Sequence, residues 1–348
     1  MTPPEAPWRA PPPRGRRQWT GKAGSTAFAG RRLTVLGAMA VFSGCALISP
    51  TPQSDALGAV ASGGPAPRRE LATVPFFPQT PYHCGPAALA TVLVHAGIES
   101  TPERLGEQVF LPSREGSLQL EMLAGARRAG ALAVRLPRTL RALIEEIDAG
   151  HPVVVLQNLG LSFAPRWHYA VLVGHDMGRR EFVLRSGVVE REILGFELFE
   201  RTWARAGHWA FVAMPPGRLP ATALEADAVD AALGFERAVA SPAARAAVYD
   251  SLVARWPDSL PALIGQGNAR AARADWDGAA ASFERAASRH DSAAAWHNLA
   301  LARWQLGQRD AARAAAQRAL ARAEAVEAAW RDAARALAAQ LNDSSGRK

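Results

Sequence analysis

The sequence predicts an α+β domain followed by an all-helical repeat domain. Helical patterns over residues 84–149 precede a series of short strands, an order that favours an α+β fold with a largely antiparallel sheet. After Met214 the strand patterns end, and Ala, Leu and Arg recur at helical spacing. With 348 residues, 49% of them apolar, the chain is long enough for two such domains.

The first 44 residues have the pattern of an export signal. Residues 1–32 contain seven basic residues and one acidic residue, and an uncharged run over residues 33–42 follows. This run is too short to span a bilayer as a stable helix, which favours a cleaved signal peptide over residues 1–44. We therefore expect the mature protein to begin at Cys45, although an ordinary secretory signal with a chance cysteine is the alternative.

The segment Ser43-Gly44-Cys45 resembles a bacterial lipobox. That resemblance implies a lipid on Cys45 and hence attachment to a membrane of the cell envelope. Because Ala46 rather than Asp follows, it also implies sorting to the outer membrane, with the protein facing the periplasm. Residues 49–70 are rich in Pro, Gly, Ser and Ala, so we expect residues 45–70 to form a flexible tether.

The charge of the chain excludes several classes of function. The formal net charge is +8, but the basic N-terminal segment holds most of it, and residues after 32 carry only +2. No later basic patch has interleaved aromatic residues, which argues against nucleic acid as a partner. The sequence also lacks a phosphate-binding glycine loop, a Cys-x-x-Cys pair and a His-Glu-x-x-His motif. We therefore expect no nucleotide, no metal and no cofactor.

The first folded domain is predicted to cover residues 71–215. Residues 84–97 are apolar on nearly all sides, which is typical of a helix buried in a core. Two amphipathic patterns predict further helices over residues 117–128 and 139–149. Runs rich in Val, Phe and Tyr predict strands, and one more helical pattern lies among them; the strands are expected at 152–157, 167–174, 181–185 and 209–213, and the helix at 190–205.

The second domain is predicted over residues 221–341, after a Pro/Gly hinge at residues 214–220. Two aromatic residues, Tyr249 and Phe283, lie 34 residues apart, a period typical of helix-turn-helix repeats. The segment Trp296-His297-Asn298-Leu299-Ala300 resembles the opening of a tetratricopeptide repeat. Two and a half to three such repeats would fit, and they imply a protein partner. A generic Ala-rich helical bundle is the alternative.

Cys84 is the first candidate for chemistry, because it is a cysteine without an evident partner in an exported protein. An extended, Pro-containing run ends at this residue and the apolar helix begins, with Pro86 suited to the first helical turn. The positive end of a helix dipole lowers the pKa of a thiol and favours the thiolate. Cys84 is therefore predicted to be a nucleophile; the alternative is a small buried hydrophobic residue.

His168 is the candidate partner of this nucleophile. A thiol needs a base that takes its proton and returns it to the leaving amine, and imidazole suits this role near neutral pH. His168 opens an otherwise apolar strand and lies far from Cys84 in sequence, as the two halves of a Cys/His pair often do. A histidine satisfied within the core is the alternative.

Two motifs make the resemblance specific: Gln79-x4-Cys84-Gly85-Pro86 and Trp167-His168-Tyr169-Ala170-Val171. They resemble the bacteriocin-processing peptidases that cut after double-glycine leaders, and their papain-like relatives, over residues 71–215. Three further segments are similar to an envelope-anchored subgroup with tetratricopeptide repeats: Gly116 to Met122, Leu156 to Gly160 and Leu184 to Gly187.

The resemblance implies a papain-like cysteine peptidase domain followed by tetratricopeptide-like repeats. Cys84 would be the nucleophile, His168 the base, and Gln79 would hold the oxyanion together with the Cys84 backbone N–H. The family places an Asp or Asn where this chain has Arg185-Ser186-Gly187, and an arginine cannot accept the imidazole proton. Ser186 and Asn158 are the candidates for orienting the imidazole, or the site works as a dyad.

The predicted function is hydrolysis of a peptide or related amide by a membrane-anchored thiol peptidase, with the repeats recruiting substrate or partner. An alternative from another class is a non-catalytic lipoprotein adaptor that binds peptides or proteins through the repeats and a degenerate peptidase domain. Transferase chemistry through the same thioester also stays open, because hydrolysis and aminolysis share the acyl-enzyme.

Overall fold

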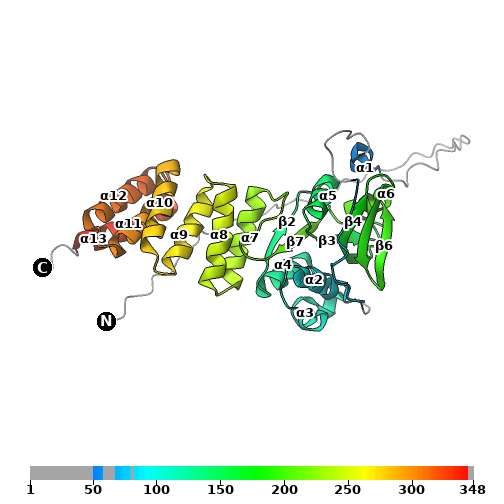
Figure 1. Cartoon of the computed structure of the whole chain (residues 1–348). Helices are drawn as coiled ribbons and strands as arrows, with labels where there is room; N and C mark the ends of the chain where they lie inside the picture. The colour runs from blue at the N-terminus through cyan, green and yellow to red at the C-terminus, as the bar shows by residue number, and fades with distance from the viewer. Residues whose placement is uncertain (1–49, 58–66, 80–81, 344–348) are drawn as a thin grey trace, which may run out of the picture. The chain divides into compact units, whose positions relative to one another are not determined.

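A computed structural model describes residues 50–57, 67–79 and 82–343 (Figure 1). The predicted signal peptide and Cys45 lie outside the described residues. The N-terminal part of the described chain is built on a seven-stranded sheet with the order β2-β7-β3-β4-β5-β6, and β1 pairs with β4. The strands are β1 (Arg68–Glu70), β2 (Leu132–Arg135), β3 (Val153–Asn158), β4 (Trp167–Asp176), β5 (Glu181–Ser186), β6 (Val189–Gly195) and β7 (Ala210–Met214).

Every pair of strands in this sheet is antiparallel, in agreement with the largely antiparallel sheet that the sequence predicted. Helices α2 and α5 pack against β4, and α6 packs against β3 and β5. The helices of this region are α1 (Pro52–Leu57), α2 (Cys84–His95), α3 (Pro102–Val109), α4 (Gln119–Arg128), α5 (Leu140–Asp148) and α6 (Phe196–Ala204). The resulting α+β domain agrees with the predicted fold class.

Several parts of this domain differ from the sequence-based prediction, among them α3 and β2, which were not predicted. The helix expected over residues 190–205 is a strand followed by a helix, because residues 189–195 pair with β5 as β6 and α6 begins only at Phe196. The segment expected to be a flexible tether is partly docked: α1 forms within it, and β1 pairs with the end of β4.

The docking of α1 depends on one buried carboxylate. Glu200 of α6 accepts hydrogen bonds from the backbone N–H of Gln53 at 3.0 Å and of Ser54 at 2.7 Å, and from the Ser54 hydroxyl at 2.6 Å. Gln53 in turn accepts the backbone N–H of Leu140 at 2.7 Å, the first residue of α5. These contacts give hydrogen-bond partners to the free backbone N–H groups at the start of α1, a helix too short to be stable alone.

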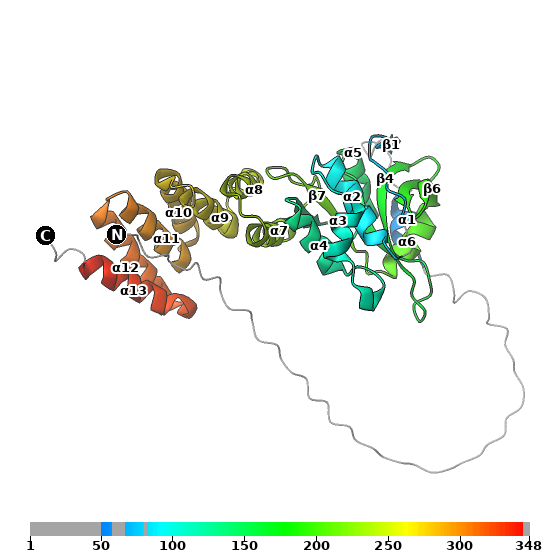
Figure 2. The same cartoon turned by 90° about the horizontal axis from the view of Figure 1, so that it is seen from below.

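The C-terminal part of the described chain contains only helices (Figures 1 and 2). Consecutive helices pack against each other from α7 to α13, which agrees with the predicted all-helical repeat region. They are α7 (Glu225–Ala238), α8 (Pro242–Arg255), α9 (Leu260–Ala271), α10 (Trp276–His290), α11 (Ala293–Gln305), α12 (Arg309–Ala325) and α13 (Arg331–Asp343). None of the helices in the described ranges is long and apolar enough to cross a bilayer.

The two aromatic residues that revealed the repeat period pack on glycines of α9. Tyr249 of α8 covers Gly265, and Phe283 of α10 covers Gly267, so closely that a Cβ at either glycine would overlap the ring. Both rings are buried. Tyr249 thus packs on the helix that follows its own and Phe283 on the helix that precedes its own, so both rings bury against α9 from its two neighbours.

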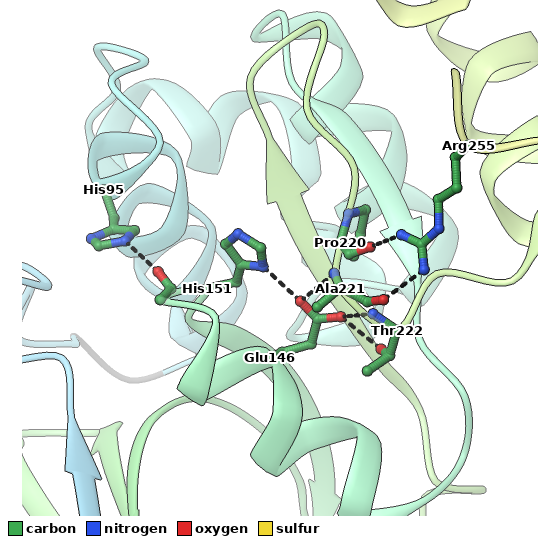
Figure 3. Close-up of polar contacts among 8 residues, drawn as sticks. His95, Glu146, His151, Pro220, Ala221, Thr222 and Arg255 are labelled. Atoms are coloured by element: carbon green, nitrogen blue, oxygen red, sulfur yellow. Dashed lines mark hydrogen bonds and ion pairs between the residues drawn. The ribbon is translucent and has the colours of Figure 1, made fainter. Parts of the chain in front are cut away.

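A cluster of hydrogen bonds joins the sheet domain to the start of the helical region (Figure 3). Glu146 of α5 is fully buried and accepts hydrogen bonds from His151, from the backbone of Ala221 and from both the backbone and the hydroxyl of Thr222. From the other side, Arg255 of α8 donates to the carbonyl oxygens of Pro220 and Ala221. Helix α7 also packs against β2 and α4.

Candidate active site

Cys84 is the first residue of α2, as the sequence predicted. Its sulfur accepts hydrogen bonds from the backbone of Tyr169, of Gly85 and of Cys84 itself. Gly85 has no room for a side chain, because a Cβ there would overlap the side chain of Ser117. The start of α2 is thus held against β4 at the residue that directly follows His168.

His168 is the second residue of β4, directly opposite Gln157 of β3. Its Nε2 atom lies 2.9 Å from Oγ of Ser186, the last residue of β5. With Nε2 bonded to this hydroxyl, Nδ1 is the ring nitrogen left to act as a base. Of the two residues predicted as orienters, Ser186 is therefore the one that contacts the imidazole.

Asn158 has a different role. Its side-chain oxygen accepts the backbone N–H groups of Gly160 and Arg166, each at 2.9 Å, and its nitrogen faces the carbonyl of Leu161. These bonds shape the loop between β3 and β4, and none of them reaches His168. Asn158 was predicted as a possible orienter of the imidazole. In the structure its side-chain amide makes its hydrogen bonds within the β3–β4 loop.

Gln79 lies on the extended segment that leads to Cys84. Its backbone N–H donates to the carbonyl of Gly187 at 3.0 Å, so this residue runs beside the end of β5 where Ser186 is found. Arg185, next to Ser186, is buried and donates to the carbonyl oxygens of Val74 and Glu190. The arginine that replaces the expected acidic residue therefore ties the segment before Cys84 to the sheet.

Burial controls the protonation of both candidate catalytic groups. It raises the pKa of the Cys84 thiol, although hydrogen bonds from the backbone of Tyr169 and Gly85 act in the opposite direction. Burial also lowers the pKa of His168; the Glu192 carboxylate opposes this shift and Arg166 adds to it. Burial thus favours the neutral thiol and the neutral imidazole, whereas the helix position of Cys84 predicted a favoured thiolate.

The other histidines have contacts elsewhere. His83 stacks on Phe110, with 4.7 Å between the ring centroids. This contact does not involve the Cys84 sulfur. His175 is buried and lies 2.8 Å from Asp148, while His95 contacts the carbonyl of Gly150 at 3.1 Å. His151 bonds to Glu146 in the cluster described above.

Tyr169 is a site residue that the sequence analysis did not single out. Its hydroxyl donates to the carbonyl of Ser117 at 3.2 Å, and burial together with the neighbouring Cys84 raises its pKa well above the ordinary value. The phenol therefore stays protonated. Its place immediately after His168 was the available sequence signal.

Comparison with known proteins shows which protein family this domain resembles. Residues 71–211 match the model of the Peptidase_C39 like family. This part of the chain therefore has the sequence pattern of the C39-like peptidases, which confirms the resemblance carried by the motifs around Cys84 and His168. No curated protein matches the chain.

Several solved structures resemble parts of the chain, and three of them are described here by their similarity. A protein from Bacillus anthracis described as a C39-like peptidase is 21% identical and aligns over 42% of this chain and 97% of its own, with a TM-score of 0.35. A double-glycine-motif protease from an AMS/PCAT transporter, solved with the leader peptide, is 21% identical over 44% and 96%, with a TM-score of 0.32. A tetratricopeptide repeat protein of Thermus thermophilus is 20% identical over 31% and 59%, with a TM-score of 0.27.

Proposed function

We propose that this protein is a thiol peptidase in which Cys84 and His168 hydrolyse a peptide or related amide bond. The observation that carries the proposal is the position of the Cys84 sulfur at the start of α2, hydrogen-bonded to the backbone of the residue that follows His168. The family match over residues 71–211 supports it. No cofactor is needed, because the sulfur itself is the nucleophile.

The reaction begins from a neutral pair. The Cys84 sulfur attacks the carbonyl carbon of the substrate while its proton passes to Nδ1 of His168, which leaves a tetrahedral oxyanion. The Cys84 backbone N–H and the Gln79 amide stabilise this oxyanion. The imidazolium then protonates the leaving amine, the C–N bond breaks and a thioester remains on Cys84. Water, deprotonated by His168, hydrolyses the thioester and restores the thiol.

Ser186 takes the place of the usual acidic or amide orienter. A hydroxyl accepts the Nε2 proton and holds the ring, but it carries no charge to stabilise the imidazolium. We therefore assign Ser186 as a positioning residue. We expect a lower turnover rate than in a site with a carboxylate at this position.

The same features favour a second candidate, a non-catalytic adaptor. Burial moves the pKa of both Cys84 and His168 toward their neutral forms, and Arg185 occupies the region of the expected acidic residue. In this case the domain binds a peptide without cleaving it, and the helical repeats bind a protein partner.

The test is cleavage of a peptide mixture by the full chain, measured by mass spectrometry, for the wild type, Cys84→Ser and His168→Ala. The peptidase predicts cleavage that falls at least about 10³-fold in either variant. Circular dichroism checks that each variant is folded. Peptide binding without cleavage in all three proteins would favour the adaptor.

The repeats and the lipid complete the proposal. The helices α7–α13 recruit substrate or a protein partner, and the lipid on Cys45 holds the protein on the envelope, at the periplasmic face of the outer membrane. This localisation is supported by the pattern of residues 33–45.

A further inference from the structure

The loop that joins β3 and β4 is a hydrogen-bonded projection beside His168, and we call residues 158–167 the β3–β4 hairpin. The Asn158 side chain accepts two backbone N–H groups within it, and the backbone N–H of Leu159 donates to Arg166 at 2.8 Å. Leu161 pairs with Ala164 across the tip. Gly160 is so close to the Ala164 carbonyl that no side chain would fit there. The hairpin therefore presents its side chains in a defined arrangement.

This hairpin carries four large apolar side chains that face solvent. Leu161 is 54% exposed, Trp167 is 56% exposed and Leu159 is also exposed. Phe163, at 86%, is the most exposed large apolar side chain in the described ranges. A side chain with so little protein around it protrudes from the surface and does not line a groove. Contiguous exposed apolar groups of this kind mark an interaction surface.

The charged side chains beside the hairpin are arginines, apart from Glu192, whose carboxylate acts on His168. Residues 158–168 contain Arg166 and neither Asp nor Glu, and the Arg166 guanidinium has no side-chain partner among the described residues. Arg205, the residue directly after α6, lies at the base, where it donates to the Asn158 carbonyl at 2.9 Å. Exposed aromatic and aliphatic side chains next to the Arg166 guanidinium are suited to the interface of a bilayer with anionic head groups.

We infer that the β3–β4 hairpin docks on an anionic phospholipid surface. Leu161 and Phe163 enter the interface between head groups and acyl chains, and Arg166 pairs with lipid phosphates. The site around Cys84 and His168 then faces polypeptides at the membrane surface. This role goes beyond peptide hydrolysis and does not depend on it.

The experiment measures the depth of a fluorescent label in the full chain. An environment-sensitive dye is attached at Phe163→Cys and, as a matched control, at Val326→Cys, which is also an exposed apolar position, beyond α12. Both proteins carry Cys45→Ser and Cys84→Ser, so that the dye has a single thiol and neither the lipid nor activity plays a part. The vesicles contain phosphatidylethanolamine, phosphatidylglycerol and a lipid with a nitroxide in its acyl chain.

The expected result is a blue shift and quenching of the dye at position 163, with neither change at position 326. Vesicles of phosphatidylcholine alone should give a weaker effect, because Arg166 then meets no anionic head group. Equal responses at positions 163 and 326 would overturn the inference. So would a dye at position 163 that responds to an added apolar peptide and not to lipid, because the hairpin would then be a substrate surface.

A second pair of variants separates docking from hydrolysis. In chains that retain Cys84, the double change Leu161→Ser and Phe163→Ser should lower vesicle binding at least fivefold relative to Val326→Ser. Hydrolysis of a short soluble peptide in detergent should stay within twofold of the wild type. A large increase in the KM for that peptide, with vesicle binding unchanged, would contradict the inference. Failure of all these proteins to hydrolyse peptide would count against the proposed function alone.

Discussion

At Cys84 two local effects act in opposite directions. The helix start and the backbone hydrogen bonds from Tyr169 and Gly85 favour a thiolate, whereas burial of the sulfur favours the thiol, and burial dominates. The sequence shows the helix start but not the depth of the site, because depth depends on how β4 and α2 pack. The prediction of a lowered thiolate pKa therefore disagrees with the structure, while the placement of the residue is confirmed.

The depressed pKa of His168 gives a prediction for the pH dependence of hydrolysis. The imidazole works as a base only when unprotonated, so the acid limb of kcat/KM should lie below the ordinary histidine pKa of about 6.5. Glu192→Gln removes a charge that favours the imidazolium and should move this limb to lower pH. Arg166→Gln should move it to higher pH. An acid limb above 6.5 in the wild type would contradict this account.

The hydrogen bond between His168 and Ser186 gives a second prediction. Ser186→Ala removes an acceptor worth about 1 kcal/mol, so kcat should fall about fivefold with little change in KM. Ser186→Asp should restore or increase kcat and shift the acid limb to higher pH, because a carboxylate stabilises the imidazolium. If Ser186→Asp leaves the pH profile unmoved, the residue does not contact the working imidazole.

At the scale of elements, the sequence predicted those features whose cause is local. The apolar helix that begins at Cys84 and the strand that begins at Trp167 have strong periodic patterns, and both are present. Residues 190–195 were predicted as helix because their charged residues mask the alternation of a strand, and it is the pairing with β5 that makes them a strand. The short elements α1 and β1 depend on distant partners such as Glu200, which no local pattern reveals.

The buried Glu146 of α5 gives a prediction for stability (Figure 3). Burial alone would raise its pKa, but hydrogen bonds from His151 and Thr222 outweigh this and hold the pKa below the ordinary value. A lowered pKa stabilises the fold fully above the unfolded carboxyl pKa of about 4.3, and this stability is lost as the pH falls through the folded pKa.

Glu146→Ala should therefore lower the free energy of unfolding by about 3 kcal/mol at pH 7, because it leaves the backbone N–H groups of Ala221 and Thr222 without a partner. The loss should shrink in acid, where the wild-type carboxyl is itself protonated. Glu145→Gln is the matched control, since its carboxylate pairs with Arg141 at the surface. Urea denaturation of both variants at several pH values measures the difference. Equal stability of the two would show that the cluster does not hold the junction.

At the scale of the whole molecule, the sheet domain and the helical region meet through α7, which packs on β2 and α4. The sequence predicted the boundary from the loss of strand patterns after Met214; β7 ends at Met214 and α7 begins at Glu225. A change in composition carries no information about contacts across a boundary, so neither the packing of α7 nor the Glu146 cluster was foreseen.

Membrane attachment is the prediction that involves the entire chain. The wild type, expressed in a bacterium, should incorporate labelled palmitate and sediment with membranes. Cys45→Ala should lose the label and leave the membrane fraction or remain unprocessed, while Cys84→Ser serves as the control cysteine change. Equal label in the wild type and in Cys45→Ala would contradict the lipid anchor.

The central claim is a thioester formed on Cys84 with the help of His168. Its most direct test is a rapid acid quench of the full chain with a cleavable peptide, followed by mass spectrometry of the fragment that contains Cys84. The account predicts a mass increase on Cys84 equal to the acyl part of the peptide, absent in Cys84→Ser and strongly reduced in His168→Ala. Peptide cleavage with no acyl group on Cys84, or with the same yield in Cys84→Ser, would contradict it.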